Sequence, residues 1–229
     1  MQYDNYVFDL YGTLIDLSTD EHAAQTWKKW GKWLDKHGIK HPYYIQFRRE
    51  FFAADRALRQ KALEEGPYEV PEIDVMDIYK DLFVKYGNKN LSEELIKEAS
   101  YAFRECSRAY IRLFPGVHEY LQRIRELGGH SYILSNAQAT YTEPEIKMFG
   151  LDTLVDDYLM SSDYRCMKPD KSFFFFLMDK YKMHPDKTLM HGDSASSDVA
   201  GARNAGIDSV YLAGENHPSR YYVEHLAGL

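Results

Sequence analysis

The stretch "YVFDLYGTLIDL", residues 6–17, decides the fold. Its first three residues, Tyr6, Val7 and Phe8, form an apolar run that predicts a buried strand. The run ends at a carboxylate, Asp9, which is followed by a Gly-Thr turn. Because ligands of open α/β sheets bind outside the carboxyl ends of the strands, a side chain in this place is positioned for chemistry. The stretch therefore predicts an α/β protein in which Asp9 belongs to the functional site.

The rest of the chain divides into a helical part and a part in which strands and helices alternate. After Leu14 the apolar spacing is helical, with breaks at "EEGPYEVPE" and "YGNKN". The spacing predicts four helices, at residues 20–38, 43–63, 74–86 and 92–111. From Phe114 onward strands and helices alternate, which is typical of a parallel sheet with helices on both faces. We expect the helical part to be an insertion that lies as a lid over the carboxyl edge of this sheet.

Composition and charge exclude several classes of function. The chain has 229 residues, of which 45% are hydrophobic and 28% charged, as in ordinary soluble globular proteins. A net charge of −7 argues against nucleic-acid binding, which calls for a basic face. No apolar run approaches the ~20 residues of a membrane span, and no apolar leader precedes the first strand. The two cysteines, Cys106 and Cys166, lack the spacing of a zinc site or a disulfide framework. We therefore expect a cytoplasmic protein that acts on a small molecule, and its oligomeric state stays open.

Four groups of polar residues follow predicted strands, so they would meet at one edge of the sheet. They are Asp9 with Thr13, Ser135 with Asn136, Lys168, and Asp193 with Asp198. Taken singly, each could be an ordinary turn, loop or helix-capping residue. Their joint occurrence after four separate segments favours a functional site.

Each of these residues has a physical task if the substrate carries a phosphoryl group. Asp9 would attack phosphorus and form an acyl phosphate that water later hydrolyses. Since a carboxylate and a phosphate dianion repel each other, the site needs positive charge. Mg²⁺ held by Asp9, Asp193 and the backbone carbonyl of Tyr11, with Lys168 beside it, would supply that charge.

The remaining polar residues would bind and orient. Thr13, Ser135 and Asn136 are candidate substrate-binding residues, because hydroxyl and amide groups donate hydrogen bonds to phosphoryl oxygens. Asp198 would hold a metal-bound water or orient Lys168. The expected partner is therefore a small phosphorylated molecule.

The four pieces "DLYGTL", "LSN", "KP" and "GDSxxxD", in this order, resemble the motifs of the haloacid dehalogenase-like hydrolase superfamily with a helical cap of its first type, subfamily IA. The resemblance covers essentially the whole chain. It implies a Rossmann-like core of residues 1–15 and 113–229 and an all-helical cap domain of residues 16–112. It also implies hydrolase activity and agrees with the roles given above to Asp9, Ser135, Lys168, Asp193 and Asp198.

Tyr11 departs from the pattern that the resemblance implies. The family's phosphatases usually carry an Asp two residues after the nucleophile, as general acid and then general base. A phenol with a pKa near 10 is a poor base at neutral pH, and loss of such a catalyst costs about 10² to 10⁴ in rate. The leaving group could be good already, water could deliver the proton, or the departing group could be a halide. Tyr11 could equally be a packing residue between the core and the insertion.

Three functions therefore stay open. The family's 2-haloacid dehalogenases carry an aromatic residue at the position of Tyr11, and they work without metal. Their fourth motif has Ser and Asn where this chain has the acids Asp193 and Asp198. A carboxylate cluster is costly without a cation, so we favour a Mg²⁺-dependent phosphohydrolase with an aspartyl-phosphate intermediate. The alternatives are a 2-haloacid dehalogenase, with Asp9 attacking carbon, and a non-catalytic ligand-binding protein.

Two further predictions concern the core. His191, on a predicted strand, is interpreted as a core histidine whose hydrogen bonds are satisfied. Residues 172–178, "SFFFFLM", predict a buried helix beside the sheet.

Overall fold

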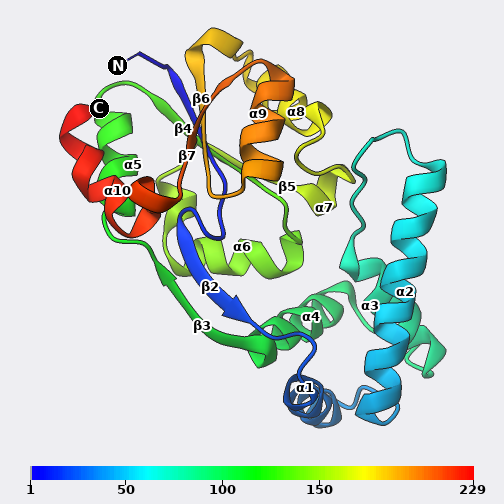
Figure 1. Ribbon diagram of the computed structural model, residues 1–229. Helices are drawn as coiled ribbons and strands as arrows, with labels where there is room; N and C mark the ends of the chain where they lie inside the picture. Colours follow the sequence, from blue (N-terminus) through cyan, green and yellow to red (C-terminus); the bar gives the residue numbers. More distant parts are fainter. Residues whose placement is uncertain (1) are drawn as a thin grey trace. The chain divides into compact units, whose positions relative to one another are not determined.

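The chain folds into two compact units in a computed structural model that describes residues 2–229 (Figure 1). Unit 1 consists of Met1–Leu17, Pro67–Glu72 and Ile111–Leu229, and unit 2 consists of Ser18–Gly66 and Ile73–Tyr110. Within residues 2–229, none of the helices combines the length and the apolar composition needed to cross a bilayer.

Unit 1 is built on a five-stranded parallel sheet, which confirms the predicted fold class. Its strands are β1 (Asn5–Phe8), β4 (His130–Ser135), β5 (Asp157–Met160), β6 (Thr188–Gly192) and β7 (Asp208–Tyr211). They lie in the order β5-β4-β1-β6-β7, so β1 is central and pairs in parallel with β4 and β6. The carboxyl ends of these three strands therefore lie side by side.

Helices cover both faces of this sheet, as predicted. Successive side chains of a strand point to opposite faces, so two neighbouring residues of β1 show which helices lie on each face. Phe8 packs with residues of α5 (Val117–Glu126), α6 (Ala139–Met148) and α10 (Pro218–His225), whereas its neighbour Val7 packs with α8 (Lys171–Tyr181) and α9 (Ala200–Ala205). Figure 1 shows α5 and α10 on one side of the strands and α8 and α9 on the other. The shorter turns of unit 1 are α7 (Ser161–Tyr164), the 3-10 turns Leu151–Thr153, Pro185–Lys187, Gly214–Asn216 and Leu226–Gly228, and a π turn at Ala195–Val199.

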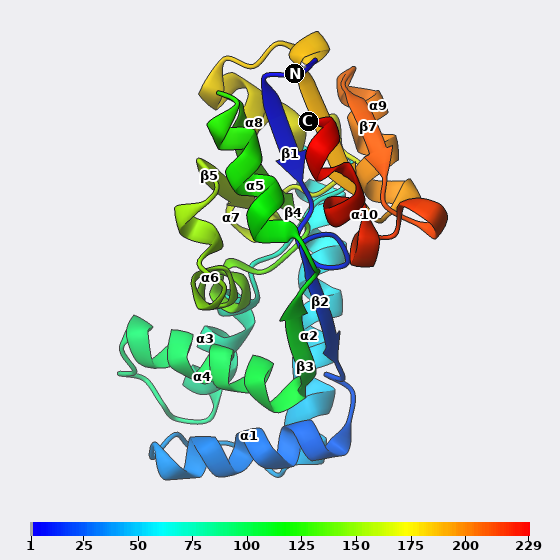
Figure 2. The ribbon, with the colours of Figure 1, turned by 90° about the vertical axis from the view of Figure 1, so that its left-hand side faces the viewer.

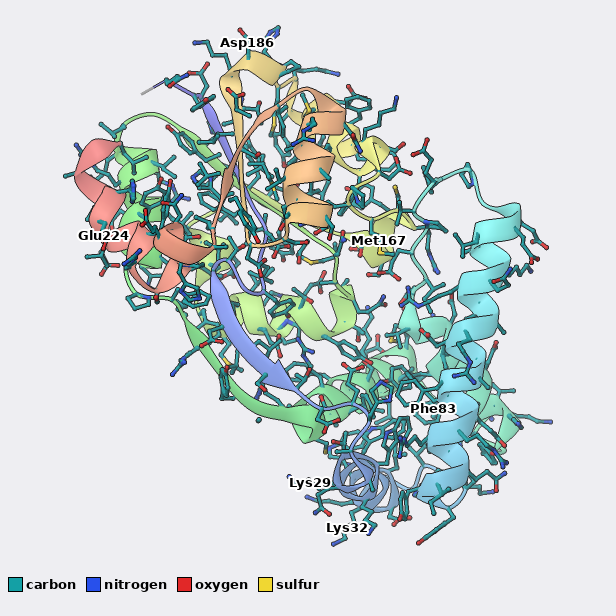
Figure 3. All side chains as sticks on the ribbon, in the orientation of Figure 1. Lys29, Lys32, Phe83, Met167, Asp186 and Glu224 are labelled. Carbon is teal, nitrogen blue, oxygen red and sulfur yellow. The ribbon has the colours of Figure 1, made fainter. Side chains whose placement is uncertain are left out.

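The part of unit 2 from Ala24 to Ser107 is built of helices, as predicted. Its helices are α1 (Ala24–Lys36), α2 (Tyr44–Glu65), α3 (Val75–Lys85) and α4 (Glu93–Ser107), and Figure 2 shows them turned by 90°. Their shared interior is aromatic, with ring contacts among Trp27, Trp30, Phe47, Phe51, Tyr79, Phe83 and Phe103. Figure 3 labels Phe83 among these side chains. Aromatic residues make up 15% of the sequence, and these seven pack in the interior of this unit.

Two predicted helix boundaries are wrong, because a two-stranded ribbon flanks the insertion. The ribbon consists of β2 (Ile15–Thr19) and β3 (Arg108–Leu113), where the sequence predicted the start of the helical region and the last turn of a helix. The residues of β3 alternate between charged or polar and apolar, which is a period of two that a helical window overlooks. Arg112 of β3 also donates to Asp16 of β2 (Nη2 to Oδ2, 2.6 Å), so the two strands are tied by an ion pair.

A short segment within the insertion packs with unit 1. This segment, Pro67–Glu72, is called the strap below. Its Val70 carbonyl accepts a hydrogen bond from Met167 N–H (3.0 Å), and Glu72 N–H donates to the Arg165 carbonyl (2.9 Å). Figure 3 labels Met167. The sequence indicated only a helix break at this place, because the pairing partner is about a hundred residues away.

His191 is a core residue, but the prediction that its hydrogen bonds are satisfied is wrong. Its ring is fully buried on β6 and stacks on Phe8 with 4.7 Å between the ring centroids. Neither ring nitrogen has a hydrogen-bond partner among residues 2–229. Burial lowers the pKa of His191 to about 3, so the ring is neutral at physiological pH and packs as an aromatic side chain.

Candidate functional site

The centre of the candidate site is Asp9, at the carboxyl end of the middle strand. Asp9 follows β1, and its N–H donates to the His191 carbonyl of β6 (2.9 Å), so the strand pairing continues up to this residue. The carboxyl ends of β4 and β6 bring Ser135 and Asp193 to the same edge. Asp9 is 8% exposed, a low value for a carboxylate at a strand end.

Lys168 lies between two of the predicted acids. Its Nζ is 2.7 Å from Asp9 Oδ1 and 2.7 Å from Asp198 Oδ1, and it donates to the Leu134 carbonyl at 2.6 Å. Asn136 holds the backbone of this lysine, because its Oδ1 accepts from Lys168 N–H and its Nδ2 donates to the Lys168 carbonyl, both at 2.8 Å. The side chain of Asn136, a candidate substrate-binding residue in the sequence, thus contacts the loop that carries Lys168.

Three carboxylates lie close together at this edge of the sheet, and two of them contact Lys168. Asp9, Asp193 and Asp198 each offer a carboxylate oxygen, and these atoms all lie within 4.8 Å of one another. Asp198 Oδ2 also accepts a hydrogen bond from Ser194 N–H (3.0 Å), which fixes its carboxylate at the start of the π turn. Among the contacts within residues 2–229, the Lys168 ammonium group pairs with two of these three carboxylates, Asp9 and Asp198.

Burial and neighbouring charges shift the pKa values of the site. Burial, opposed by Lys168 and reinforced by Asp198, raises the pKa of Asp9 to about 6. Burial and the charge of Asp198 also raise the pKa of Asp193. For Lys168, burial alone would lower the pKa, but the charges of Asp9 and Asp198 outweigh it and raise the pKa.

The residues fit a divalent cation. Mg²⁺ prefers hard oxygen ligands, and the cluster supplies three carboxylate oxygens from two segments at one locus. Gly12, with φ of +86°, brings the turn so close that a Cβ there would lie 2.3 Å from Asp193 Oδ2. The backbone after Asp9 is therefore packed directly against the Asp193 carboxylate, and only glycine fits at this position.

The other predicted binding residues lie at the same edge. Thr13 is fully buried, and its Oγ1 lies 3.5 Å from Asp193 Oδ1, at the limit of a hydrogen bond. Its carbonyl accepts a hydrogen bond from the Tyr222 hydroxyl of α10 (3.1 Å). Ser135 is buried at the end of β4. The structure thus gathers all four predicted groups at the carboxyl edge of the sheet.

The phenol of Tyr11 contacts α6. Its hydroxyl donates to Glu145 Oε2 at 2.5 Å and lies 3.2 Å from Thr142 Oγ1. Tyr11 is partly buried, whereas Glu145 and Thr142 are 0% and 1% exposed. This arrangement gives the phenol a defined hydrogen-bonded position in unit 1.

Sequence reasoning missed Glu145 and Asp170. Glu145 gave no signal, because its partner is 134 residues away and a single sequence does not show such a pair. Asp170 could have been found, since it precedes α8 as an N-cap and its Oδ1 accepts from Ser172 N–H (2.9 Å). Its Oδ2 also accepts from Glu69 N–H of the strap (2.9 Å), which no local pattern indicates.

The structure thus combines a parallel sheet with an all-helical insertion, and it places a carboxylate, a lysine and an acidic pair at the carboxyl edge of the sheet. The family model described as haloacid dehalogenase-like hydrolase matches residues 3–206. The chain belongs to this family, and the predicted resemblance is confirmed.

Two curated relatives resemble the chain in sequence, and a solved structure resembles it in fold. The chain is 28% identical over 130 residues to a phosphoglycolate phosphatase from Mannheimia succiniciproducens, which covers 55% of this chain and 58% of that protein. It is 24% identical over 212 residues to the pyrimidine 5'-nucleotidase PynA from Streptococcus pneumoniae, covering 92% and 84%. The structure of a 2-haloacid dehalogenase from Pseudomonas syringae shares the fold, with a TM-score of 0.63, 19% identity, and 99% and 98% of the two chains covered. The chain thus spans little more than half the length of the first of these relatives.

Proposed function

We propose that this protein hydrolyses a small phosphorylated metabolite with Mg²⁺ as cofactor and Asp9 as nucleophile. The observation that carries the proposal is the cluster of Asp9, Asp193 and Asp198, of which Asp9 and Asp198 pair with one buried lysine. A cation is needed to offset this charge, and a phosphoryl dianion makes the need greater. The relatives named as a phosphatase and a nucleotidase support a phosphate substrate.

The proposed mechanism has two steps. An Asp9 carboxylate oxygen attacks phosphorus, the bond from phosphorus to the leaving oxygen breaks, and an acyl phosphate forms on Asp9. Water then attacks phosphorus, and the bond to Asp9 breaks to release inorganic phosphate. Bound between Asp9, Asp193 and the backbone carbonyl of Tyr11, Mg²⁺ would neutralise negative charge on the transferred group.

The other residues of the site position the reacting groups. Lys168 keeps Asp9 Oδ1 in a fixed orientation through its 2.7 Å contact and adds positive charge beside the nucleophile. Asp198 holds Lys168 from the other side. The hydroxyls of Thr13 and Ser135 are the candidate donors to the phosphoryl oxygens, while Asn136 acts through the backbone of Lys168.

One observation favours a second candidate function. Tyr11 occupies the place of the usual acid, and a halide leaves without a proton, so displacement of halide from a 2-haloacid by Asp9 is the alternative. The same nucleophile would then attack carbon. The acids at Asp193 and Asp198 argue against it, because a metal site has no use in that reaction.

Parallel assays test the proposal and separate the alternatives. Wild-type protein and Asp9→Asn would be assayed with p-nitrophenyl phosphate, with and without Mg²⁺, and with 2-chloropropionate while chloride release is followed. We expect phosphate release that needs both Asp9 and Mg²⁺. Chloride release that needs Asp9 but no metal would replace this function with dehalogenation. If neither substrate is turned over, the result would favour the non-catalytic ligand-binding protein.

A further inference from the structure

Helix α10, near the end of the chain, contacts the turn that follows the nucleophile. The Tyr222 hydroxyl of α10 donates a hydrogen bond to the Thr13 carbonyl, with 3.1 Å between the two oxygens. Both residues are 0% exposed, so this bond lies in the interior of unit 1. None of the residues predicted for the candidate site lies on α10. The bond therefore links the site to an element that carries none of the sequence motifs.

The Tyr222 side chain is fixed and stays a hydrogen-bond donor. Its ring packs edge-on against the rings of Tyr120 and Tyr221, with 5.1 Å and 5.5 Å between the ring centroids. Burial raises the pKa of Tyr222 well above its ordinary value, so the hydroxyl keeps its proton at physiological pH. A buried carbonyl that loses its donor is costly, and this cost keeps the turn in contact with α10.

The turn of residues 9–13 is closely packed, so its position sets the geometry of the site. Gly12 lies so near Asp193 that a Cβ on Gly12 would be 2.3 Å from Asp193 Oδ2. Thr13 Oγ1 lies 3.5 Å from Asp193 Oδ1. A shift of this turn therefore moves the backbone after the nucleophile relative to the Asp193 carboxylate.

We propose that Tyr222 is a positioning residue, whose hydroxyl holds the turn of residues 9–13 in the arrangement that binds the phosphoryl group. This inference rests on the proposed phosphohydrolase function. Tyr222 is fully buried, so it acts through Thr13. Loss of its hydroxyl leaves the Thr13 carbonyl without this donor and frees the turn to move. A small misplacement of reacting groups costs up to about 10²-fold in rate.

The variant Tyr222→Phe tests the inference, because it removes the hydroxyl and keeps the ring. A neutral hydrogen bond contributes up to about a factor of ten, so we expect kcat/KM for p-nitrophenyl phosphate with Mg²⁺ to fall by about that factor. The affinity for inorganic phosphate, measured by calorimetry with Mg²⁺, should fall as well. The matched control is Tyr221→Phe, which removes a neighbouring hydroxyl that is hydrogen-bonded to Tyr120. This control should keep both values.

Hydrogen exchange reports on the turn itself, independently of activity. The backbone N–H groups of Leu14 and Ile15 donate to the Leu10 carbonyl at 2.8 Å and 2.9 Å, so their exchange with solvent requires the turn to open. In Tyr222→Phe we expect these two amides to exchange up to about tenfold faster than in the wild-type protein. In Tyr221→Phe they should exchange as in the wild-type protein.

Three results would overturn the inference. An unchanged kcat/KM in Tyr222→Phe would mean that the hydroxyl positions nothing. An equal loss in both variants would mean that aromatic packing, and not the bond to Thr13, is responsible. A loss in Tyr222→Phe without faster exchange at Leu14 and Ile15 would mean that the effect does not pass through the turn. If the wild-type protein shows no turnover that depends on Asp9, the proposed function itself fails, which differs from all three results.

Discussion

At the scale of single residues, the site depends on Lys168. Its ammonium group is fully buried and contacts Asp9, Asp198 and the carbonyl of Leu134. A buried charge is tolerated only when it is paired and hydrogen-bonded, and here each charge is the partner of another. Lys168 is therefore as much a part of the folded structure as of the proposed chemistry.

Removal of the ammonium group should destabilise the fold. Lys168→Met leaves Asp9 and Asp198 as uncompensated buried charges, and breaking such a pair costs about 3–5 kcal/mol of unfolding free energy. Urea denaturation at neutral pH without metal measures this cost. Lys171→Met, at an exposed lysine at the start of α8, is the control and should change stability little. A loss below about 1 kcal/mol in Lys168→Met would show that the contacts to Lys168 contribute little.

The candidate site could be predicted from the sequence only in part. Asp9, Lys168, Asp193 and Asp198 were predicted to meet because each follows a strand, and parallel strands present their carboxyl ends at one edge. The partners of Tyr11 could not be predicted, because contact between Tyr11 and Glu145 depends on how α6 packs. The chemical roles of these residues stay predictions.

At the scale of elements, the strap is tied to the loop that carries the lysine. Asp170, two residues after Lys168, caps α8 through Oδ1 and accepts from the strap through Oδ2. Burial opposes ionisation of Asp170, but backbone N–H groups of Ser172, Val70 and Glu69 outweigh it and lower the pKa of this carboxyl. The ionised form of Asp170 therefore stabilises the fold.

The lowered pKa of Asp170 predicts a pH dependence of stability. Because the folded-state pKa lies below the ordinary value of 3.8, the contribution is fully present above that value and is lost as pH falls through the folded-state pKa. Asp170→Asn should lower the unfolding free energy by about 1–3 kcal/mol at neutral pH, and by less in strong acid. Urea denaturation across pH, with Asp179→Asn on the same helix as control, measures it. An equal loss at every pH would contradict the account.

The elements that the sequence did not predict are those that depend on distant partners. The helices of the insertion and the alternating part follow from local apolar periods. The ribbon of β2 and β3 joins segments almost a hundred residues apart, and the strap pairs with residues 165–170. A strand that is only partly buried has a weak pattern of its own, so these pairings became visible only in the structure.

At the scale of the whole molecule, binding of Mg²⁺ should stabilise the folded chain. A ligand that binds only the folded state adds about 2.7 kcal/mol at 100 times its dissociation constant. We therefore expect the melting temperature of wild-type protein to rise by several degrees with Mg²⁺, and that of Asp193→Asn to rise much less.

The matched control for this measurement is Asp186→Asn. Asp186 is exposed just before β6, at the opposite end of the strand from Asp193, and Figure 3 labels it. This variant should keep the wild-type response to Mg²⁺. The same rise in wild type and Asp193→Asn would place the bound metal away from the three carboxylates.

The most direct test of the central claim is to find the phosphoryl group on Asp9. Wild-type protein turning over p-nitrophenyl phosphate with Mg²⁺ would be quenched in acid, digested, and analysed by mass spectrometry of its peptides. The account predicts a phosphoryl group on Asp9 in the peptide that contains "YVFDLYGTLIDL", and none in Asp9→Asn. Turnover that continues in Asp9→Asn, or a phosphoryl group found on another residue, would contradict it.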